Sequence, residues 1–318
     1  MLNFDFSHDP DAPVLVIGGA GVDIVGRLRD SLLPGSSSPA KIRTSFGGVA
    51  RNVAENLARL GQNVALITAV GQDQQGVQLL ERLEEAGVDA SRALCTATYT
   101  TGAYLAVVDS AGKLQFALDD MRAESVLSPA YLREQEDLFK QASLLFLDAN
   151  LPKDTLRTAF SLARKARLPV CADPTSASLA DRLRRYLPRL RLITPNCVEA
   201  GILWDQPFEP SRQEQALEAA KYLVGQGVDI VLITLAEFGV CYATSETSGH
   251  VPALRTEILD PTGAGDALAA TVIFALLNEI PLDDAVRLGV TAASLTLRHS
   301  GTVLPDLSLE MLYDHLVI

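Results

Sequence analysis

The sequence predicts an α/β fold in which a doubly wound, mainly parallel sheet carries helices on both faces. Short apolar runs alternate with amphipathic stretches along most of the chain. The runs lie near Val14, Val64, Leu144, Val170, Leu192 and Ile230. Such runs are typical of strands that are buried on both faces, and their alternation with helices indicates parallel βαβ units.

The amphipathic stretches have the period of an α-helix. In residues 51–60, Val53 and Leu57 share one apolar face, and in residues 213–224 Ala220 and Leu223 do so. We therefore expect helices over both ranges.

Two segments interrupt the alternation. Residues 24–46 contain a loop rich in serine and proline, and residues 95–121 are rich in Thr, Tyr and Val with a turn at 109–112. We expect both to be β segments inserted into a single domain that covers residues 1–318. Ligands bind at the carboxyl ends of the strands in such sheets, so the inserted strands are expected to form a small sheet that acts as a lid.

The composition is that of a globular protein. The 27 basic and 39 acidic side chains give a net charge of −12, which argues against a nucleic acid or a membrane as the partner. Residues 1–11 lack the features of a signal peptide, and no stretch is apolar enough to span a bilayer, so we expect a cytoplasmic protein. Four widely spaced cysteines favour buried free thiols over a metal or disulfide site.

The first glycine cluster, Gly18 to Asp23, directly follows a predicted strand. It does not match the dinucleotide fingerprint, because Ile24 stands where the third glycine is required. Asp23 is placed to accept hydrogen bonds from the hydroxyls of a ligand, although a turn or cap aspartate would also fit.

A second glycine pair, Gly47 and Gly48, precedes the helix predicted at 51–60. Asn52 lies in its first turn, where an amide can reach a ligand seated on the helix end; an ordinary N-terminal turn explains the glycines equally well. The only Gly-Lys pair in the chain is followed by Leu114, so the P-loop motif is absent from the sequence.

Asn196 and Glu199 stand three residues apart just after the strand near Leu192. The spacing puts both on one side of a helical start, where the carboxylate could hold water around Mg²⁺. A helix-capping arrangement would use the same pair.

The stretch DPTGAGDA, residues 260–267, is the strongest motif. Gly263 and Gly265 allow a close approach to the main chain, and an apolar helix follows. The amides at a helix start form an anion site, and the helix dipole is expected to keep Asp266 ionised near neutral pH. An ionised Asp266 beside a phosphoryl group could take the proton of an attacking hydroxyl, whereas Asp260 is better suited to shaping the loop. A glycine-rich helix cap is the alternative.

Together these residues resemble the ribokinase-like (PfkB) family of carbohydrate and nucleoside kinases. The likeness extends over nearly the whole chain and keeps the order of an early strand-end Asp, GG-x-x-x-N, N-x-x-E and D-x-T-G-A-G-D. It implies a three-layer α/β/α core with a β lid, ATP with Mg²⁺ as donor, a primary hydroxyl as acceptor, stimulation by K⁺, and pairing of two copies through the lid.

The resemblance also implies roles for individual residues. Asp266 matches the catalytic base, in an anion hole formed by Gly263, Ala264 and Gly265. The positions that match acceptor contacts are Asp23, Gly48, Asn52 and Asn150. Those that match the nucleotide site are Asn196, Thr234, Gly239 and Gly265. Glu199 matches the Mg²⁺ position, acting through water, and Asp260 and Thr262 match part of a monovalent-cation loop.

Within the family, the chain resembles the pseudouridine kinases. Arg51 before Asn52, and Asp120 with Met121 in the inserted segment, are features of that subgroup. The resemblance therefore implies phosphorylation of the 5′-hydroxyl of a nucleoside, pseudouridine first. Ribose, fructose or another ketose, or a purine nucleoside are alternative acceptors, and a catalytically silent sugar or nucleotide sensor is a remote alternative.

Three positions depart from the family pattern. Ala236 stands where glycine is usual near the nucleotide, and Thr271 where Ala or Gly is usual. The third lies near Val290 or Thr291, where the family often has an asparagine that meets the nucleotide, and neither residue supplies a carboxamide. We therefore expect adenine to be held mainly by apolar contacts, with loose selection among nucleoside triphosphates.

Overall fold

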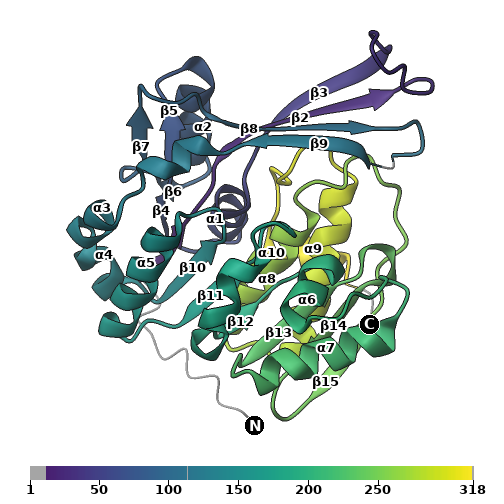
Figure 1. The fold of residues 1–318 in the computed structure, drawn as a ribbon. Coiled ribbons are helices and arrows are strands. Elements are labelled where there is room, and N and C mark those ends of the chain that lie inside the picture. The colour runs from purple at the N-terminus through teal and green to yellow at the C-terminus, as the bar shows by residue number, and fades with distance from the viewer. Residues whose placement is uncertain (1–11, 113, 317–318) are drawn as a thin grey trace.

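A nine-stranded sheet forms the centre of the computed structural model, which describes residues 12–112 and 114–316 (Figure 1). Its order is β15 (Ser248–Val251), β14 (Val240–Ala243), β13 (Ile230–Thr234), β12 (Leu192–Ile193), β11 (Val170–Asp173), β10 (Leu144–Asp148), β1 (Val14–Ile17), β4 (Val64–Ile67) and β6 (Val88–Asp89). The strands from β13 to β6 are parallel, and β14 and β15 add an antiparallel edge.

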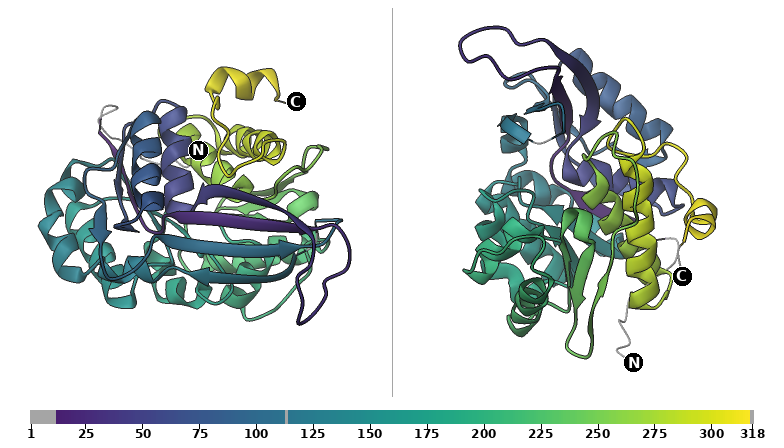
Figure 2. Two further views of the ribbon diagram at one scale, coloured as in Figure 1. Left: turned by 90° about the horizontal axis from the view of Figure 1, so that it is seen from above. Right: turned by 90° about the vertical axis from the view of Figure 1, so that its right-hand side faces the viewer.

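Helices cover both faces of this sheet (Figure 2). One face packs against α1 (Val49–Arg59), α2 (Gln74–Glu85), α8 (Ala264–Leu277), α9 (Leu282–Leu297) and α10 (Leu309–Asp314). The other packs against α3 (Pro129–Glu134), α4 (Glu136–Gln141), α5 (Lys153–Ala166), α6 (Cys197–Trp204), α7 (Gln213–Gly225) and the 3₁₀ helix η2 (Ala180–Arg189). Val16 points into the first core and Leu15 into the second. The predicted three-layer fold is confirmed.

A second, four-stranded sheet, called the small sheet below, projects from one end of the molecule (Figure 1). Its order is β3 (Ala40–Gly47), β2 (Gly21–Leu28), β8 (Gly102–Val108) and β9 (Leu114–Asp120). The β2–β8 pair is parallel, and the other two pairs are antiparallel. The start of the segment 95–121 lies elsewhere, because β7 (Leu94–Thr96) pairs with β5 (Ala69–Gly71). The 3₁₀ helix η1 (Arg122–Val126) follows β9.

The predicted helices are present as α1 and α7, and α8 begins directly after the glycine-rich turn. All four cysteines are free, but the expectation that all are buried is wrong for Cys95, which is exposed in strand β7. Among the described residues, no helix is long and apolar enough to cross a membrane. Residues 1–11, where we expected no signal peptide, lie outside the described part of the chain.

Candidate active site

Acidic side chains from distant segments converge at the carboxyl ends of the central strands. Asp148 and Asp173 end β10 and β11, and Asp266 lies in the first turn of α8. Asp173 and Asp148 both act to raise the pKa of Asp266. Like charges raise one another's pKa only when they lie close, so these carboxylates share one site.

Gly263 starts helix α8 in a conformation that other residues adopt rarely. Its φ is 82°, and a Cβ atom at this position would lie 1.9 Å from the carbonyl oxygen of Thr302. The turn can therefore pass close under residue 302 only with glycine. By helix geometry, the amides of Ala264, Gly265 and Asp266 have no partner within the helix and are free to bind an anion. The predicted anion hole of Gly263, Ala264 and Gly265 stays a prediction.

The protonation of Asp266 differs from the expectation. Burial raises its pKa to about 8, with the nearby carboxylates adding to the shift. The helix dipole was expected to keep the side chain ionised near neutral pH; desolvation and carboxylate repulsion outweigh it. A cation near these carboxylates would restore the ionised form.

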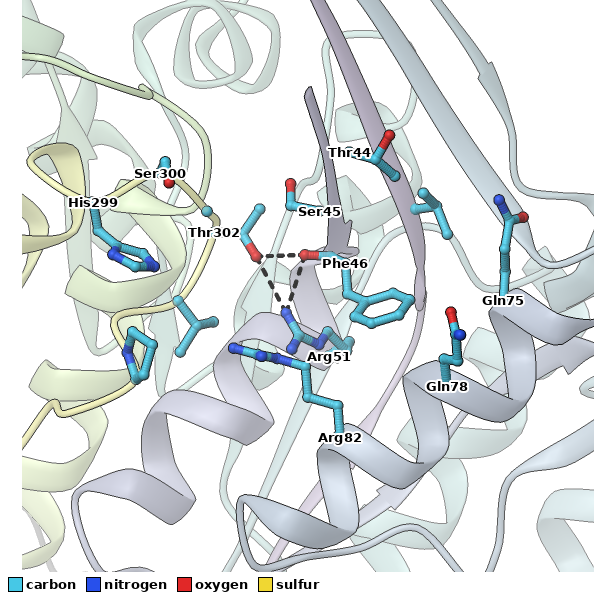
Figure 3. Close-up of a pocket in the computed structure, with 14 residues that line it drawn as sticks. Thr44, Ser45, Phe46, Arg51, Gln75, Gln78, Arg82, His299, Ser300 and Thr302 are labelled. Carbon is cyan, nitrogen blue, oxygen red and sulfur yellow. Dashed lines mark hydrogen bonds between the residues drawn. The ribbon is translucent and has the colours of Figure 1, made fainter. Parts of the chain in front are cut away.

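Asn52, a predicted acceptor contact, is hydrogen-bonded to Asp266. Its side-chain amide donates a hydrogen bond of 2.7 Å to Oδ2 of Asp266, and its own oxygen accepts one of 2.8 Å from Arg51. Arg51 also donates to the carbonyl of Phe46 at 3.1 Å and to the hydroxyl of Thr302 at 3.2 Å (Figure 3). With its oxygen engaged by Arg51, the amide of Asn52 is oriented with its NH₂ group toward Asp266.

A buried carboxylate forms an ion pair with Arg51. Glu55 is fully buried and forms an ion pair with Arg51, and its other oxygen lies 2.7 Å from Arg59 and 3.4 Å from Arg82. A cavity of about 460 Å³ adjoins this network and is lined in part by Arg51, Arg82 and Thr302 (Figure 3). Neither Glu55 nor this network was predicted from the sequence.

The predicted acceptor residues lie around the connection between β1 and β2. Asp23 is buried next to Gly47, where a Cβ atom would come within 2.4 Å of its carboxyl carbon. Burial raises the pKa of Asp23 to about 7, although Arg51 opposes the shift. Gly48 precedes α1 with a φ of 96°, and the side-chain nitrogen of Asn150 faces Gly19.

Asp148 ties these segments together and was missed from the sequence. Its Oδ2 accepts hydrogen bonds from the amides of Gly19 at 2.8 Å and Ala50 at 3.1 Å, and its Oδ1 accepts one from Asn150 at 3.0 Å. An aspartate at the end of a buried strand, in the run LDAN, was the signal that could have identified it.

Asn196 and Glu199 form a capping box at the start of α6, which was one of the two alternatives. The side chain of Asn196 accepts from the amide of Glu199 at 3.0 Å, and Glu199 accepts from the amide of Asn196 at 2.9 Å. Burial raises the pKa of Glu199 to about 8, and Asp173 and Asp266 act on it as well. Glu199 therefore also faces the carboxylate cluster, and its predicted role toward Mg²⁺ stays a prediction.

Two further predicted nucleotide positions are Thr234, which lies beside Asn196, and Gly239. Thr234 ends β13 and forms an isolated parallel bridge with Asn196. Gly239 has a φ of 94°, and Ala236 has a φ of 49° in the left-handed region. Only glycine adopts that region without strain, which explains physically why glycine is favoured at position 236.

The loop before α8 is shaped by Asp260, which is buried and accepts a hydrogen bond of 3.0 Å from the amide of Thr262. The predicted binding of a monovalent cation by this loop stays a prediction.

Two threonines occupy positions that depart from the family pattern. Thr271 is fully buried on α8, and Thr291 donates its hydroxyl to the carbonyl of Arg287 within α9. That bond leaves position 291 without a free donor for a nucleotide.

The family comparison agrees with this geometry. A model of the pfkB family of carbohydrate kinases matches residues 12–308. The chain belongs to this family. It is therefore a phosphotransferase that acts on a hydroxyl group of a sugar or nucleoside, and ATP with Mg²⁺ is expected for PfkB kinases.

Three similar proteins are kinases named for different substrates. A pseudouridine kinase from Escherichia coli is 31% identical, over 93% of this chain and 94% of its own. A guanosine-inosine kinase from Exiguobacterium acetylicum is 31% identical, over 88% and 93%. The structure of an Arabidopsis thaliana ribokinase, complexed with ribose and ATP, aligns with a TM-score of 0.82 at 21% identity, over 96% of this chain and 99% of its own.

Proposed function

We propose that this PfkB kinase transfers the γ-phosphoryl group of ATP to the 5′-hydroxyl of a nucleoside, with pseudouridine as the first acceptor. The observation that carries the proposal is the 2.7 Å hydrogen bond between Asn52, a predicted acceptor contact, and Asp266, the predicted base. It brings the acceptor side and the base within one hydrogen bond of each other. The identity of 31% to a pseudouridine kinase supports the choice of acceptor.

In the proposed reaction, Asp23 and the amide of Gly48 bind the ribose hydroxyls and place the 5′-hydroxyl beside Asp266. Asp266 accepts the proton of that hydroxyl as its oxygen attacks the phosphoryl group. The amides of Ala264 and Gly265 stabilise the charge on the phosphoryl oxygens. Arg51 and Asn52 position Asp266 throughout.

The carboxylates fit a magnesium ion. Burial, Asp173 and Asp266 raise the pKa of Glu199, and burial and Asp173 raise that of Asp266, so an oxygen-rich and negatively charged site is available to a hard cation. Mg²⁺ would neutralise phosphate charge when bound. Glu199 would hold it through water.

Asp260 and Thr262 would bind K⁺. The effect of K⁺ on the rate of ADP release is measured by adding it to the assay.

A panel of acceptors tests the proposed substrate. ADP release is measured with pseudouridine, uridine, guanosine, adenosine, ribose and fructose, each with and without K⁺. We expect the highest kcat/KM for pseudouridine. A higher value for guanosine or adenosine would move the assignment to a purine nucleoside kinase, and a preference for ribose or fructose would move it to a sugar kinase.

We also propose that two copies pair through the small sheet and that the enzyme acts in the cytoplasm. The outer face of the small sheet carries Ile42, Leu118 and Phe116, which are 69%, 64% and 42% exposed. Exposed apolar surface of this kind is typical of an interface. Sedimentation should show a dimer for the wild type and a monomer for Ile42→Glu; a monomeric wild type would contradict the proposal.

A further inference from the structure

One face of the small sheet carries a row of basic residues that leads away from Asp23. In β2, Asp23, Val25 and Arg27 point to the same side, because side chains alternate along a strand. The strand register pairs Val25 with Arg43 and Arg27 with Lys41. Arg43 therefore lies roughly 7 Å, and Lys41 roughly 13 Å, beyond the level of Asp23 along the strand.

These three cations line a cavity of about 200 Å³ whose opposite wall is formed by residues 259–262. All the basic side chains of this cavity come from the small sheet, and the loop contributes the carboxylate of Asp260. Arg43 reaches the loop through a long contact of 3.5 Å from Nη1 to the carbonyl of Leu259.

No described carboxylate forms a salt bridge with Arg27, Lys41 or Arg43, although the protein as a whole has a net charge of −12. Three cations facing a cavity that holds one carboxylate leave an excess of positive charge. Such an excess is complemented by an anion, and guanidinium groups are well shaped for phosphate oxygens.

We propose that Arg27, Lys41 and Arg43 bind the triphosphate of the nucleotide donor, an inference that rests on the kinase function proposed above. The loop that they face leads directly into Gly263 and the amides of α8, where the transferred phosphoryl group would lie. A nucleoside acceptor is uncharged and is anchored at Asp23, at the near end of the row.

The surroundings make this contribution necessary. The carboxylates at the strand ends repel a polyanion, and Mg²⁺ offsets only part of that repulsion. Val290 and Thr291 offer adenine no carboxamide, so the phosphates must supply a larger share of the binding free energy. The same contacts would hold the small sheet over the site while the donor is bound.

Calorimetric titration of the full-length enzyme with MgATP, adenosine and pseudouridine tests the proposal. We expect Arg27→Ala combined with Arg43→Ala to raise the Kd of MgATP about tenfold or more, since each charge-assisted contact is worth that order of affinity. The Kd values of adenosine and pseudouridine should change less than twofold. Arg43→Lys should keep most of the affinity, and the dependence of the MgATP Kd on NaCl should weaken in the double variant.

Arg29→Ala is the matched control, because Arg29 is exposed directly after the end of β2 and does not line the cavity. An unchanged Kd for MgATP in the double variant would overturn the proposal. An increase in the Kd of pseudouridine alone would overturn it as well. If the double variant loses its circular dichroism spectrum, Lys41→Ala, at an exposed position, should show a smaller shift in the same direction. A wild-type enzyme that fails to bind MgATP would instead refute the donor assignment of the proposed function.

Discussion

The side chain of Asn52 donates a 2.7 Å hydrogen bond to Oδ2 of Asp266, across 214 residues of sequence. Asn52 belongs to the helix that follows Gly47 and Gly48, and Asp266 to the helix that follows the turn at Gly263. Helices α1 and α8 pack side by side on one face of the sheet, so their first turns open on the same site. The bond stabilises the ionised form of Asp266 and fixes its orientation.

Asp266→Asn should lower kcat by about 10²- to 10⁴-fold, because the amide cannot accept the proton of the acceptor hydroxyl. The change keeps the size of the side chain and the helix start. ADP release under saturating substrates measures the loss, and the Kd of MgATP should stay within a few-fold of wild type. Turnover above about a tenth of the wild-type value would show that Asp266 is not the base.

Activity should rise with pH as Asp266 loses its proton. Its pKa is raised to about 8, so the carboxyl is protonated below that pH and competent as a base above it. Asn52→Ala removes a hydrogen bond that lowers the pKa, and the ascending limb of the kcat/KM profile should move to higher pH. Asn150→Ala is the control: it should reduce kcat/KM for the acceptor without moving the limb. A limb that stays in place in Asn52→Ala would argue against the positioning role.

The residues that could be predicted from sequence are those in short contiguous motifs. Gly263 to Asp266 combine a turn, a helix start and a carboxylate within four positions, so local rules are sufficient. Asp148 and Glu55 were not predicted because their roles depend on partners that are brought together by folding. The amide of Gly19, for example, bonds to Asp148 from 129 residues away. Helix periodicity cannot distinguish a buried Glu from a solvated one.

The same limit applies to the fold. Buried runs of apolar residues identified the parallel strands, because a strand that is buried on both faces appears in the sequence as a continuous apolar run. The edge strands β14 and β15 have only four residues each, and β15 includes Ser248 and His250, which lack the apolar pattern. The expected ionisation of Asp266 was wrong because its pKa is raised first by burial and then by Asp173 and Asp148, and both effects arise only in the folded chain.

Glu55→Gln should destabilise the protein by about 3 kcal/mol, because it leaves the buried Arg51 without its counter-ion. Urea denaturation followed by circular dichroism measures the free energy of unfolding. Glu84→Gln on α2 is the matched control, since Glu84 is exposed and should change stability by less than about 0.5 kcal/mol. Equal stability of the two variants would mean that the arginines around Glu55 find other partners.

Glu124 should make the protein less stable as pH rises. It is 1% exposed, and burial raises its pKa to about 8 from an ordinary value of 4.5. Between these two values the folded state keeps a proton that the unfolded state has lost, so stability falls with increasing pH across this interval.

Glu124→Gln removes this titration, and its free energy of unfolding should depend less on pH between 5 and 8. For a pKa shift of this size, the free energy of unfolding of the wild type should fall by about 3–5 kcal/mol more than that of the variant across the interval. Denaturation of both proteins at several pH values measures the difference, and the isosteric change keeps the side chain in its place beside Gly19. Parallel pH profiles for the two proteins would show that Glu124 is ionised in the folded state, with a partner that offsets its burial.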